Sequence, residues 1–228
     1  MKRRELISTM AKGAALLVPA LPVLALGGES TKQSHATATC SAPPGGRGAH
    51  YFPNVPVIDH EGEMAVFYRD LIKDKVVVIN FMSIAFHEKY PITQNLAGLQ
   101  DLVGDHLGKD VFMYSITFDP VHDTPRALKA FADRFDARPG WSFLTGKPAD
   151  VKAIQDRFFT TIDGATHHGK AAHCEGDCSR GIVRIGNERL GRWAAVPSRS
   201  RPEVMAHYFQ FMGLAKPLDH FKNMARKA

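Results

Sequence analysis

The 228-residue chain lacks any apolar run of the roughly 20 residues that a helix needs to cross a bilayer. It also lacks basic residues interleaved with aromatic residues along one face, which argues against nucleic-acid binding. Cysteine is scarce, so any thiol chemistry must come from Cys40, Cys174 or Cys178. The remaining composition, 44% hydrophobic and 23% charged, is typical of a folded domain rather than a disordered tail.

The N-terminus has the pattern of an export signal. A basic stretch, MKRRELISTMAKG, precedes an apolar segment, AALLVPALPVLAL, that two prolines make a poor membrane helix. Val23 and Ala25 supply the small residues of a cleavage site, and the pair Arg3-Arg4 resembles a twin-arginine signal. We therefore expect residues 1–25 to be removed on export to the periplasm or an equivalent compartment, with an uncleaved N-terminal membrane anchor as the alternative.

The remaining chain divides by composition. Removal of residues 1–25, which carry four basic residues against one acidic residue, lowers the formal charge from +6 to +3. Residues 26–50 are rich in Ser, Thr, Gly and Pro, which predicts a flexible linker with Cys40 as a lone thiol. We expect residues 51–214 to form one domain and residues 215–228 a solvated basic tail. In an oxidising compartment two neighbouring cysteines can persist as a disulfide.

Short, continuous apolar runs with β-branched residues predict strands buried on both faces. Three such runs are VVVIN at 76–80, DVFMYSITFD at 110–119 and WSFLTG at 141–146. After a polar stretch at 160–180, GIVRIGN at 181–187 and LGRWAAV at 190–196 predict a hairpin with its turn at Asn187-Glu188-Arg189.

Apolar residues at three- and four-residue spacing predict helices between and after these strands. We expect Asp123 or Thr124 to cap the second helix, with Pro125 at its first position. The four predicted helices and their apolar faces are 93–108 with Leu96, Leu99, Val103 and Leu107; 123–135 with Leu128, Phe131 and Phe135; 148–159 with Val151, Ile154 and Phe158; and 201–212 with Val204, Tyr208 and Phe211.

A β-α-β-α-β-β-α order over about 150 residues is the arrangement of the thioredoxin fold with an insertion. The sequence therefore predicts an α/β domain: a thioredoxin-like three-layer sandwich with a central mixed sheet. The inserted loop, 160–180, precedes the C-terminal hairpin.

That loop contains HHGKAAHCEGDC, residues 167–178. The three residues between Cys174 and Cys178 suit a disulfide, and the same spacing suits two thiolate ligands for Cu(I) or Zn(II). His173 supplies an adjacent imidazole, and His167 and His168 are further candidate ligands. A redox dithiol and a purely structural disulfide remain open, although so short a closed loop contributes well under the ~3 kcal/mol of a 15-residue loop.

The segment DPVHDTP offers two carboxylates, Asp119 and Asp123, around His122. We interpret Asp119 as the end of a strand and Asp123, with Thr124, as a helix cap. His122 lies at the carboxyl end of a strand, where α/β folds place their sites.

Several segments together resemble the Sco/SenC family of exported thioredoxin-fold proteins linked to copper delivery and thiol redox in cytochrome oxidase assembly. They are FPNVPVIDHEGEMAVFYRDLIKDKVVVINFM, PITQNLAGLQ, YSITFDPVHDTPRALKAF, WSFLTG and VRIGN, and they span about Phe52 to Trp193.

The active-site motif departs from the family. The family carries C-x-x-x-C-P after the NFM strand, whereas this chain reads NFMSIAFHEKYPIT, with Phe86 and Tyr90 at the cysteine positions. Neither side chain replaces a thiolate as a soft ligand or a redox centre. His87 lies inside this span, and we favour a packed or surface residue over a ligand. The family's third ligand, a histidine before the GIVRIG strand, corresponds to a position near Cys178.

The resemblance, with the relocated motif, implies copper binding through Cys174, Cys178 and His173. It implies delivery of copper to an oxidase subunit or another cuproprotein of the cell envelope, near a membrane, by a metallochaperone rather than an enzyme. Two alternatives are a thiol–disulfide reductase acting on a partner's copper-site cysteines and a non-catalytic assembly factor that has lost its site.

Overall fold

The computed structural model describes residues 46–89, 92–159 and 181–221. Cys40, Cys174, Cys178 and His173 all lie outside these ranges. Within the ranges, no helix combines the length and the apolar character needed to cross a membrane.

A seven-stranded mixed sheet forms the centre of the domain, in the order β2-β1-β5-β4-β3-β6-β7. Strands β3, β4 and β5 run parallel, and the other neighbours pair antiparallel. The mixed sheet that the sequence predicted is therefore confirmed. The strands are β1 (Pro56–Asp59), β2 (Met64–Val66), β3 (Val76–Met82), β4 (Val111–Thr117), β5 (Trp141–Thr145), β6 (Ile182–Asn187) and β7 (Arg192–Pro197).

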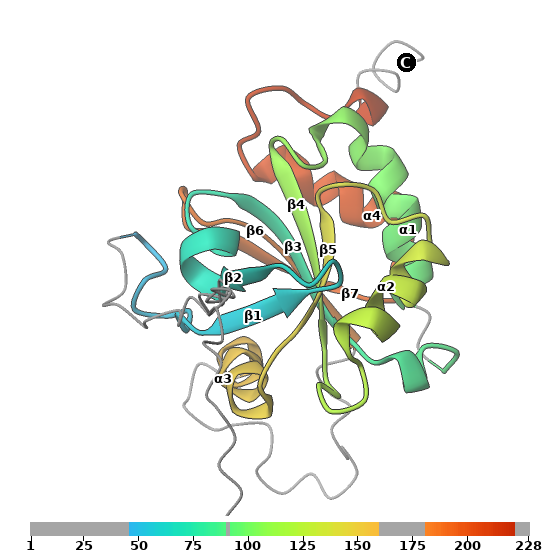
Figure 1. Ribbon diagram of the computed structural model, residues 1–228. Coiled ribbons are helices and arrows are strands. Elements are labelled where there is room, and N and C mark those ends of the chain that lie inside the picture. Colours follow the sequence, from blue (N-terminus) through green and yellow to red (C-terminus); the bar gives the residue numbers. More distant parts are fainter. Residues whose placement is uncertain (1–45, 90–91, 160–180, 222–228) are drawn as a thin grey trace, which may run out of the picture. The chain divides into compact units, whose positions relative to one another are not determined.

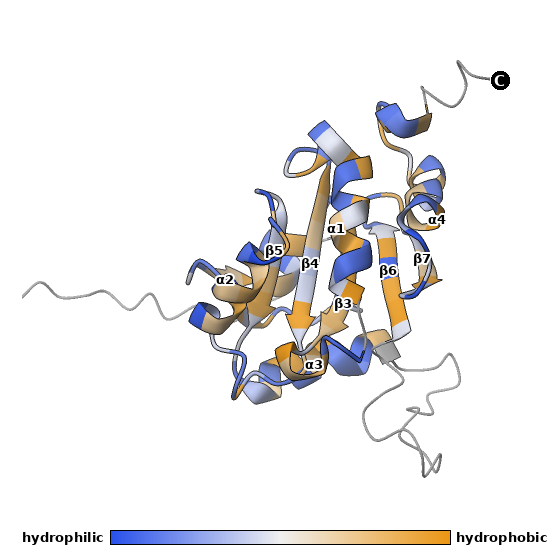
Figure 2. Ribbon diagram, turned by 90° about the vertical axis from the view of Figure 1, so that its right-hand side faces the viewer, coloured by the Kyte–Doolittle hydropathy of each residue, from blue (hydrophilic) through white to orange (hydrophobic). Residues whose placement is uncertain are grey.

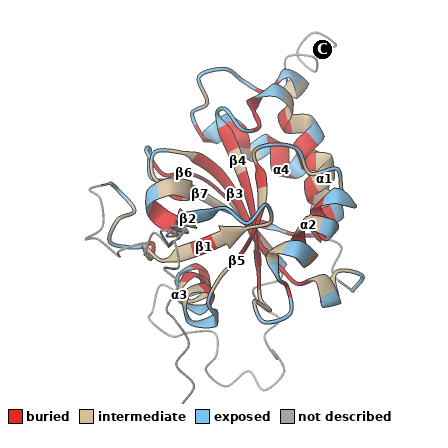
Figure 3. Cartoon of the chain, viewed as in Figure 1, coloured by how far each residue is buried: buried red, intermediate tan, exposed pale blue. Residues whose placement is uncertain are grey.

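The apolar runs occupy the middle of the sheet because both of its faces are covered. All seven residues of β3 are buried, and β3 pairs with β4 from Val76 opposite Val111 to Met82 opposite Thr117. Figure 2 shows hydrophobic residues along β3, and Figure 3 shows the central strands buried. This is the expected result for a strand without a polar face.

Helices pack on both faces, which completes the predicted three-layer sandwich (Figure 1). One face carries α1, α2 and α4, and the other carries α3 and the π-helical turn η1. The bounds are α1 (Ile92–Val103), α2 (Pro125–Asp133), α3 (Pro148–Phe159), α4 (Pro202–His207) and η1 (Phe67–Ile72). The apolar faces predicted for the first and third helices are buried as expected.

Two helices differ from the sequence prediction. The first ends early, because Gly104 takes a left-handed conformation (φ 58°) and only a short 3-10 turn, η3 (Gly104–His106), follows. The face predicted for the last helix is partly wrong: Tyr208 packs against the core as expected, but Val204 and Phe211 are exposed, while Met205 and Phe209 are buried. At Phe211 the physical reason is that α4 stops at His207 and tightens into a 3-10 turn, η5 (Tyr208–Phe211), which rotates the side chains of the turn.

The hairpin between β6 and β7 is present, but its turn is not a simple surface turn. Asn187 pairs with Arg192, so residues 188–191 make the connection. Glu188 is only 1% exposed, and its carboxylate accepts hydrogen bonds from Gly48 N (2.7 Å), Tyr68 Oη (2.9 Å) and Asp74 N (2.8 Å). One carboxylate therefore joins the hairpin to residues 46–52, to η1 and to the turn before β3.

Candidate functional site at the carboxyl ends of the central strands

The parallel strands β3 and β4 end side by side, which is where an α/β sheet places a site. Their last residues, Met82 and Thr117, are opposite each other. Two residues before these strand ends, Ser115 Oγ donates to Asn80 Oδ1 at 2.7 Å and accepts from Trp141 Nε1 at 3.0 Å. A buried polar chain thus runs across the sheet just below this edge, and it fixes the strand ends relative to each other.

Asp123 fastens the turn after β3 to the end of β4. Its Oδ2 accepts from Ile84 N at 3.3 Å and from the Thr117 hydroxyl, and the residue is 3% exposed. Burial raises the pKa of the Asp123 carboxyl, and the two hydrogen bonds oppose that shift in part. The expectation that Asp123 caps a helix is therefore wrong: Thr124 alone caps α2, accepting from Ala127 N at 3.3 Å, while Asp123 turns inward.

The turn that replaces the family's cysteine motif is a short 3-10 segment, η2 (Ile84–Phe86). Phe86, at the position of the first cysteine, is 44% exposed. Tyr90, at the position of the second, lies outside the described residues. Where a thiolate would stand, the surface therefore presents an aromatic side chain that offers no donor to a metal.

His87 is packed between aromatic rings, which agrees with the interpretation favoured from the sequence. Its ring meets Phe131 and Phe135 edge-on, with centroids 5.1 and 5.0 Å apart. Burial lowers the pKa of His87, helped by the charge of Arg134, so the imidazole is neutral at pH 7. Its Nδ1 is buried and has no hydrogen-bond partner among the described residues.

The remaining histidine of this edge is exposed. His122 lies 79% exposed, with its Nδ1 2.8 Å from the carboxylate of Asp119. An exposed pair of this kind is of little energetic weight. Nowhere in the described parts of the chain do three His, Cys, Asp or Glu side chains gather closely enough to hold a metal ion.

The loop with the predicted ligands Cys174, Cys178 and His173 lies outside the described residues, but both of its attachment points lie beside β3. At its start, Phe158 near the end of α3 packs on Phe81 with ring centroids 5.6 Å apart. At its end, Val183 of β6 pairs with Asn80 of β3. The chain therefore leaves and rejoins the described domain next to the carboxyl end of β3.

The sequence did not predict that two carboxylates would be buried. Asp123 and Glu188 both stand in hydrophilic, turn-like segments, DPVHDTP and NERLG, which favour exposure. Most of their hydrogen-bond donors lie far along the chain: Ile84 for Asp123, which also accepts from the nearby Thr117, and Gly48, Tyr68 and Asp74 for Glu188. No local signal distinguishes such a carboxylate from an exposed one.

Comparison with known proteins agrees with the family resemblance. The model of the SCO1/SenC family matches residues 91–177, a match that begins directly after the turn without cysteines. A SCO2-like protein of Rickettsia conorii is 30% identical over 103 residues, which are 45% of this chain and 48% of that protein. The chain thus matches about half the length of this curated relative.

Solved structures agree in fold. BsSco, described as a member of the Sco family of cytochrome c oxidase assembly proteins with a disulfide switch, has a TM-score of 0.52 at 17% identity, covering 73% of this chain and 96% of its own. A SCO1/SenC family lipoprotein from Bacillus anthracis has a TM-score of 0.51 at 19% identity, covering 72% and 95%. At these identities the likeness shows the fold, and it confirms the thioredoxin-like α/β architecture.

Proposed function

Because the SCO1/SenC family model matches residues 91–177 while the turn after β3 carries no cysteine, we propose that this chain binds copper through a relocated site. The thiolates of Cys174 and Cys178 are the principal ligands, and the imidazole of His173 is the third. Thiolates select soft Cu(I), and a mixed thiolate–imidazole set also accepts Cu(II).

One observation supports the proposal: the described residues on either side of the 160–180 segment lie beside the carboxyl end of β3. Phe158 packs on Phe81 before the segment, and Val183 pairs with Asn80 after it. The turn that carries the family's cysteines begins from the same strand end. We therefore expect metal ligands on this segment to take the place of the cysteines that are missing from the turn.

The chemistry of the turn itself favours relocation over retention. Phe86 offers no donor, and His87 is neutral and held between Phe131 and Phe135. A metal bound there would need further donors, and the described residues provide no group of three. Cys174 and Cys178 are the only two cysteines that lie close together in the sequence.

We further propose that the protein is exported and delivers copper to an oxidase subunit or another cuproprotein of the cell envelope, near the membrane. The signal-like N-terminus and the family support this location. Cell fractionation with an antibody to the folded domain tests it: recovery of the full-length chain in the cytoplasm alone would contradict export.

Copper loading of the purified protein under reducing conditions tests the site. We expect one copper per chain, measured by elemental analysis after gel filtration, and loss of that copper in Cys174→Ser/Cys178→Ser. The matched control is Cys40→Ser, which removes the third thiol and should leave loading unchanged. His173→Ala should weaken binding while preserving some uptake.

Three outcomes would reject the proposal. Equal copper uptake by the wild type and the double variant would place the metal elsewhere. A mixed disulfide with a partner, trapped when one cysteine is replaced in a protein that takes up no copper, would favour the reductase instead. Normal cellular function of the double variant would favour a non-catalytic assembly factor.

A further inference from the structure

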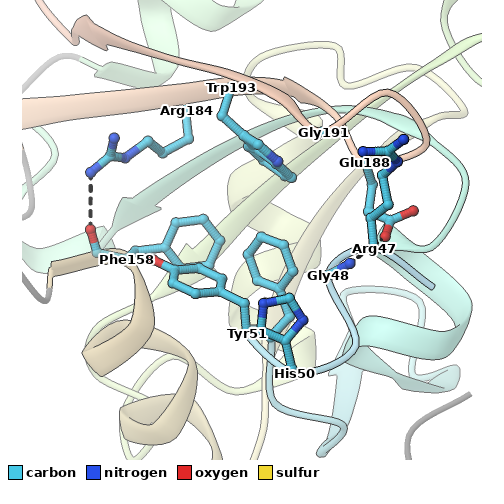
Figure 4. A pocket seen from close by; sticks show the side chains of 10 residues that line it. Arg47, Gly48, His50, Tyr51, Phe158, Arg184, Glu188, Gly191 and Trp193 are labelled. Carbon is cyan, nitrogen blue, oxygen red and sulfur yellow. Dashed lines mark hydrogen bonds between the residues drawn. The ribbon is translucent and has the colours of Figure 1, made fainter. Parts of the chain in front are cut away.

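A cavity lies on the face of the sheet that carries α3, and Phe158, which packs on Phe81 of β3, forms part of its wall. Its walls are the segment 47–52, the end of α3 and the β6–β7 hairpin, and its volume is about 340 Å³ (Figure 4). That volume falls within the roughly 300–1,000 Å³ of small-molecule sites. Nothing in the proposed copper chemistry uses this cavity.

Aromatic rings form the walls of the cavity. Phe52 is central: its ring centroid lies 4.9 Å from Tyr51, 5.6 Å from Phe158 and 5.1 Å from Trp193. Trp193 stands on one side and Tyr51 with Phe158 on the other, as Figure 4 shows. Tyr51 and Trp193 nevertheless remain 42% and 36% exposed, so their faces are open to a ligand.

The β6–β7 hairpin fixes the position of the Trp193 indole. A Cβ at Gly186 would lie 2.1 Å from the Trp193 ring, so the absence of a side chain on β6 allows the ring to lie across that strand. The Tyr51 hydroxyl donates to the carbonyl of Arg157, which ties the opposite wall to α3. Both walls are thus held by contacts of the fold itself.

Two arginines supply positive charge to this aromatic cavity. Arg184 is held by a hydrogen bond from its Nη2 to the carbonyl of Phe158 at 3.1 Å, and Arg47 lines the cavity beside Gly191. Throughout the described parts of the chain, neither guanidinium has a carboxylate within ion-pair distance. Glu188 also lines the cavity and keeps its negative charge, but Arg47 and Arg184 together exceed it by one positive charge.

We propose that this cavity binds a planar aromatic carboxylate. The ring stacks against the exposed rings of Trp193 and Tyr51, where offset or edge contacts between aromatic rings are favourable, and the carboxylate is held by the guanidinium groups of Arg47 and Arg184. Inorganic anions leave the aromatic walls unused, and neutral aromatics leave the excess positive charge of the cavity uncompensated. A ligand that joins both features matches every wall of the cavity.

Titration of the purified, copper-free full chain with 2-naphthoate, followed by calorimetry, tests this assignment. We expect saturable binding of one ligand per chain. The neutral analogue 2-naphthalenemethanol should bind about tenfold or more weakly, because it forms no charge-assisted hydrogen bond. This comparison needs no change to the protein, so it does not depend on how any variant folds.

The double variant Arg47→Gln/Arg184→Gln should weaken 2-naphthoate binding by a similar factor and leave the neutral analogue nearly unaffected. The matched control is Arg192→Gln: Arg192 also bonds a backbone carbonyl, that of Phe211 at 3.0 Å, but does not line the cavity. It should bind as the wild type does.

Three results would overturn the proposal. They are no saturable binding up to millimolar ligand, equal affinity for the charged and neutral compounds, and equal affinity in the wild type and the double arginine variant. Binding of an acidic aromatic peptide without binding of 2-naphthoate would also overturn it, since the cavity would then recognise a protein segment. Because copper is absent from the assay, each result is independent of the Cys174/Cys178 site.

Discussion

Replacing Glu188 with glutamine tests the role of the buried carboxylate most directly. The change keeps the shape of the side chain but removes its charge and turns one acceptor oxygen into a donor. The carboxylate accepts from Gly48 N, Tyr68 Oη and Asp74 N, so at least one of these donors will face an amide N–H in the variant.

The expected loss in the free energy of unfolding follows from those contacts. A hydrogen bond to a charged group contributes about 1.5–3 kcal/mol, and leaving one buried donor unsatisfied costs about 1–3 kcal/mol. Since Glu188 is 1% exposed, water does not replace the lost acceptor. We therefore expect Glu188→Gln to lower the free energy of unfolding by about 2–4 kcal/mol at pH 7.

The pH dependence gives a second signature. Burial acts to raise the pKa of Glu188, but the hydrogen bonds from Asp74, Gly48 and Tyr68 outweigh it, and the net pKa is lowered. A carboxyl with a lowered pKa in the folded state stabilises the protein above its unfolded pKa and loses that contribution as the pH falls through the folded value. The difference between wild type and variant should therefore shrink on going from pH 7 to about pH 3.

Urea denaturation followed by tryptophan fluorescence measures both effects. Glu203→Gln is the matched control, because Glu203 is exposed on α4 and its replacement should change the free energy of unfolding by less than about 0.5 kcal/mol. If Glu188→Gln unfolds within that same margin of the wild type at pH 7, the carboxylate does not join the three segments as described.

Three further predictions concern other buried groups. Burial and the Glu188 carboxylate raise the pKa of Tyr68 to about 12, and burial also raises the pKa of Tyr114; ultraviolet titration should therefore show two late phenols, of which Tyr68→Phe removes one, and the stability that Tyr68 contributes should be lost as the pH rises from about 10 to 12. Asp123→Ala should lower the free energy of unfolding by about 1–3 kcal/mol in urea, because two donors lose their acceptor, and a change below about 0.5 kcal/mol would contradict this. Gly186→Ala should displace the Trp193 indole and shift its fluorescence, whereas Gly181→Ala, whose Cβ meets nothing within 4 Å, should not; identical spectra would refute the packing.

The central strands and the helices between them could be predicted because their signals are local. β3 is a run of β-branched and apolar residues with both faces buried, and Val151, Ile154 and Phe158 mark one face of α3 at helical spacing. The N-terminal strands β1 and β2 carried no comparable signal, since they contain four and three residues. The face of the last helix was wrong at Phe211 because a 3-10 turn changes the angle between successive residues that the pattern assumes.

The candidate site was only partly accessible from the sequence. The family motif showed which turn lacks its cysteines, and the structure places Phe86 there as an exposed side chain. The residues that shape the two sites were not found, because Asp123 and Glu188 depend on donors up to 39 and 140 residues distant. The assignment of Cys174, Cys178 and His173 stays a prediction that copper loading will decide.

The hydrogen bond from Gly48 to Glu188 joins residues 140 positions apart, and this separation has a consequence for the order of folding. Contacts between distant residues form late, because closing a long loop costs entropy before the contact can repay it. During synthesis, residues 46–52 therefore cannot form this contact until nearly the whole domain has been made and the β6–β7 hairpin is in place. The aromatic cavity, which residues 47–52 and the hairpin line together, is then among the last features of the domain to be completed.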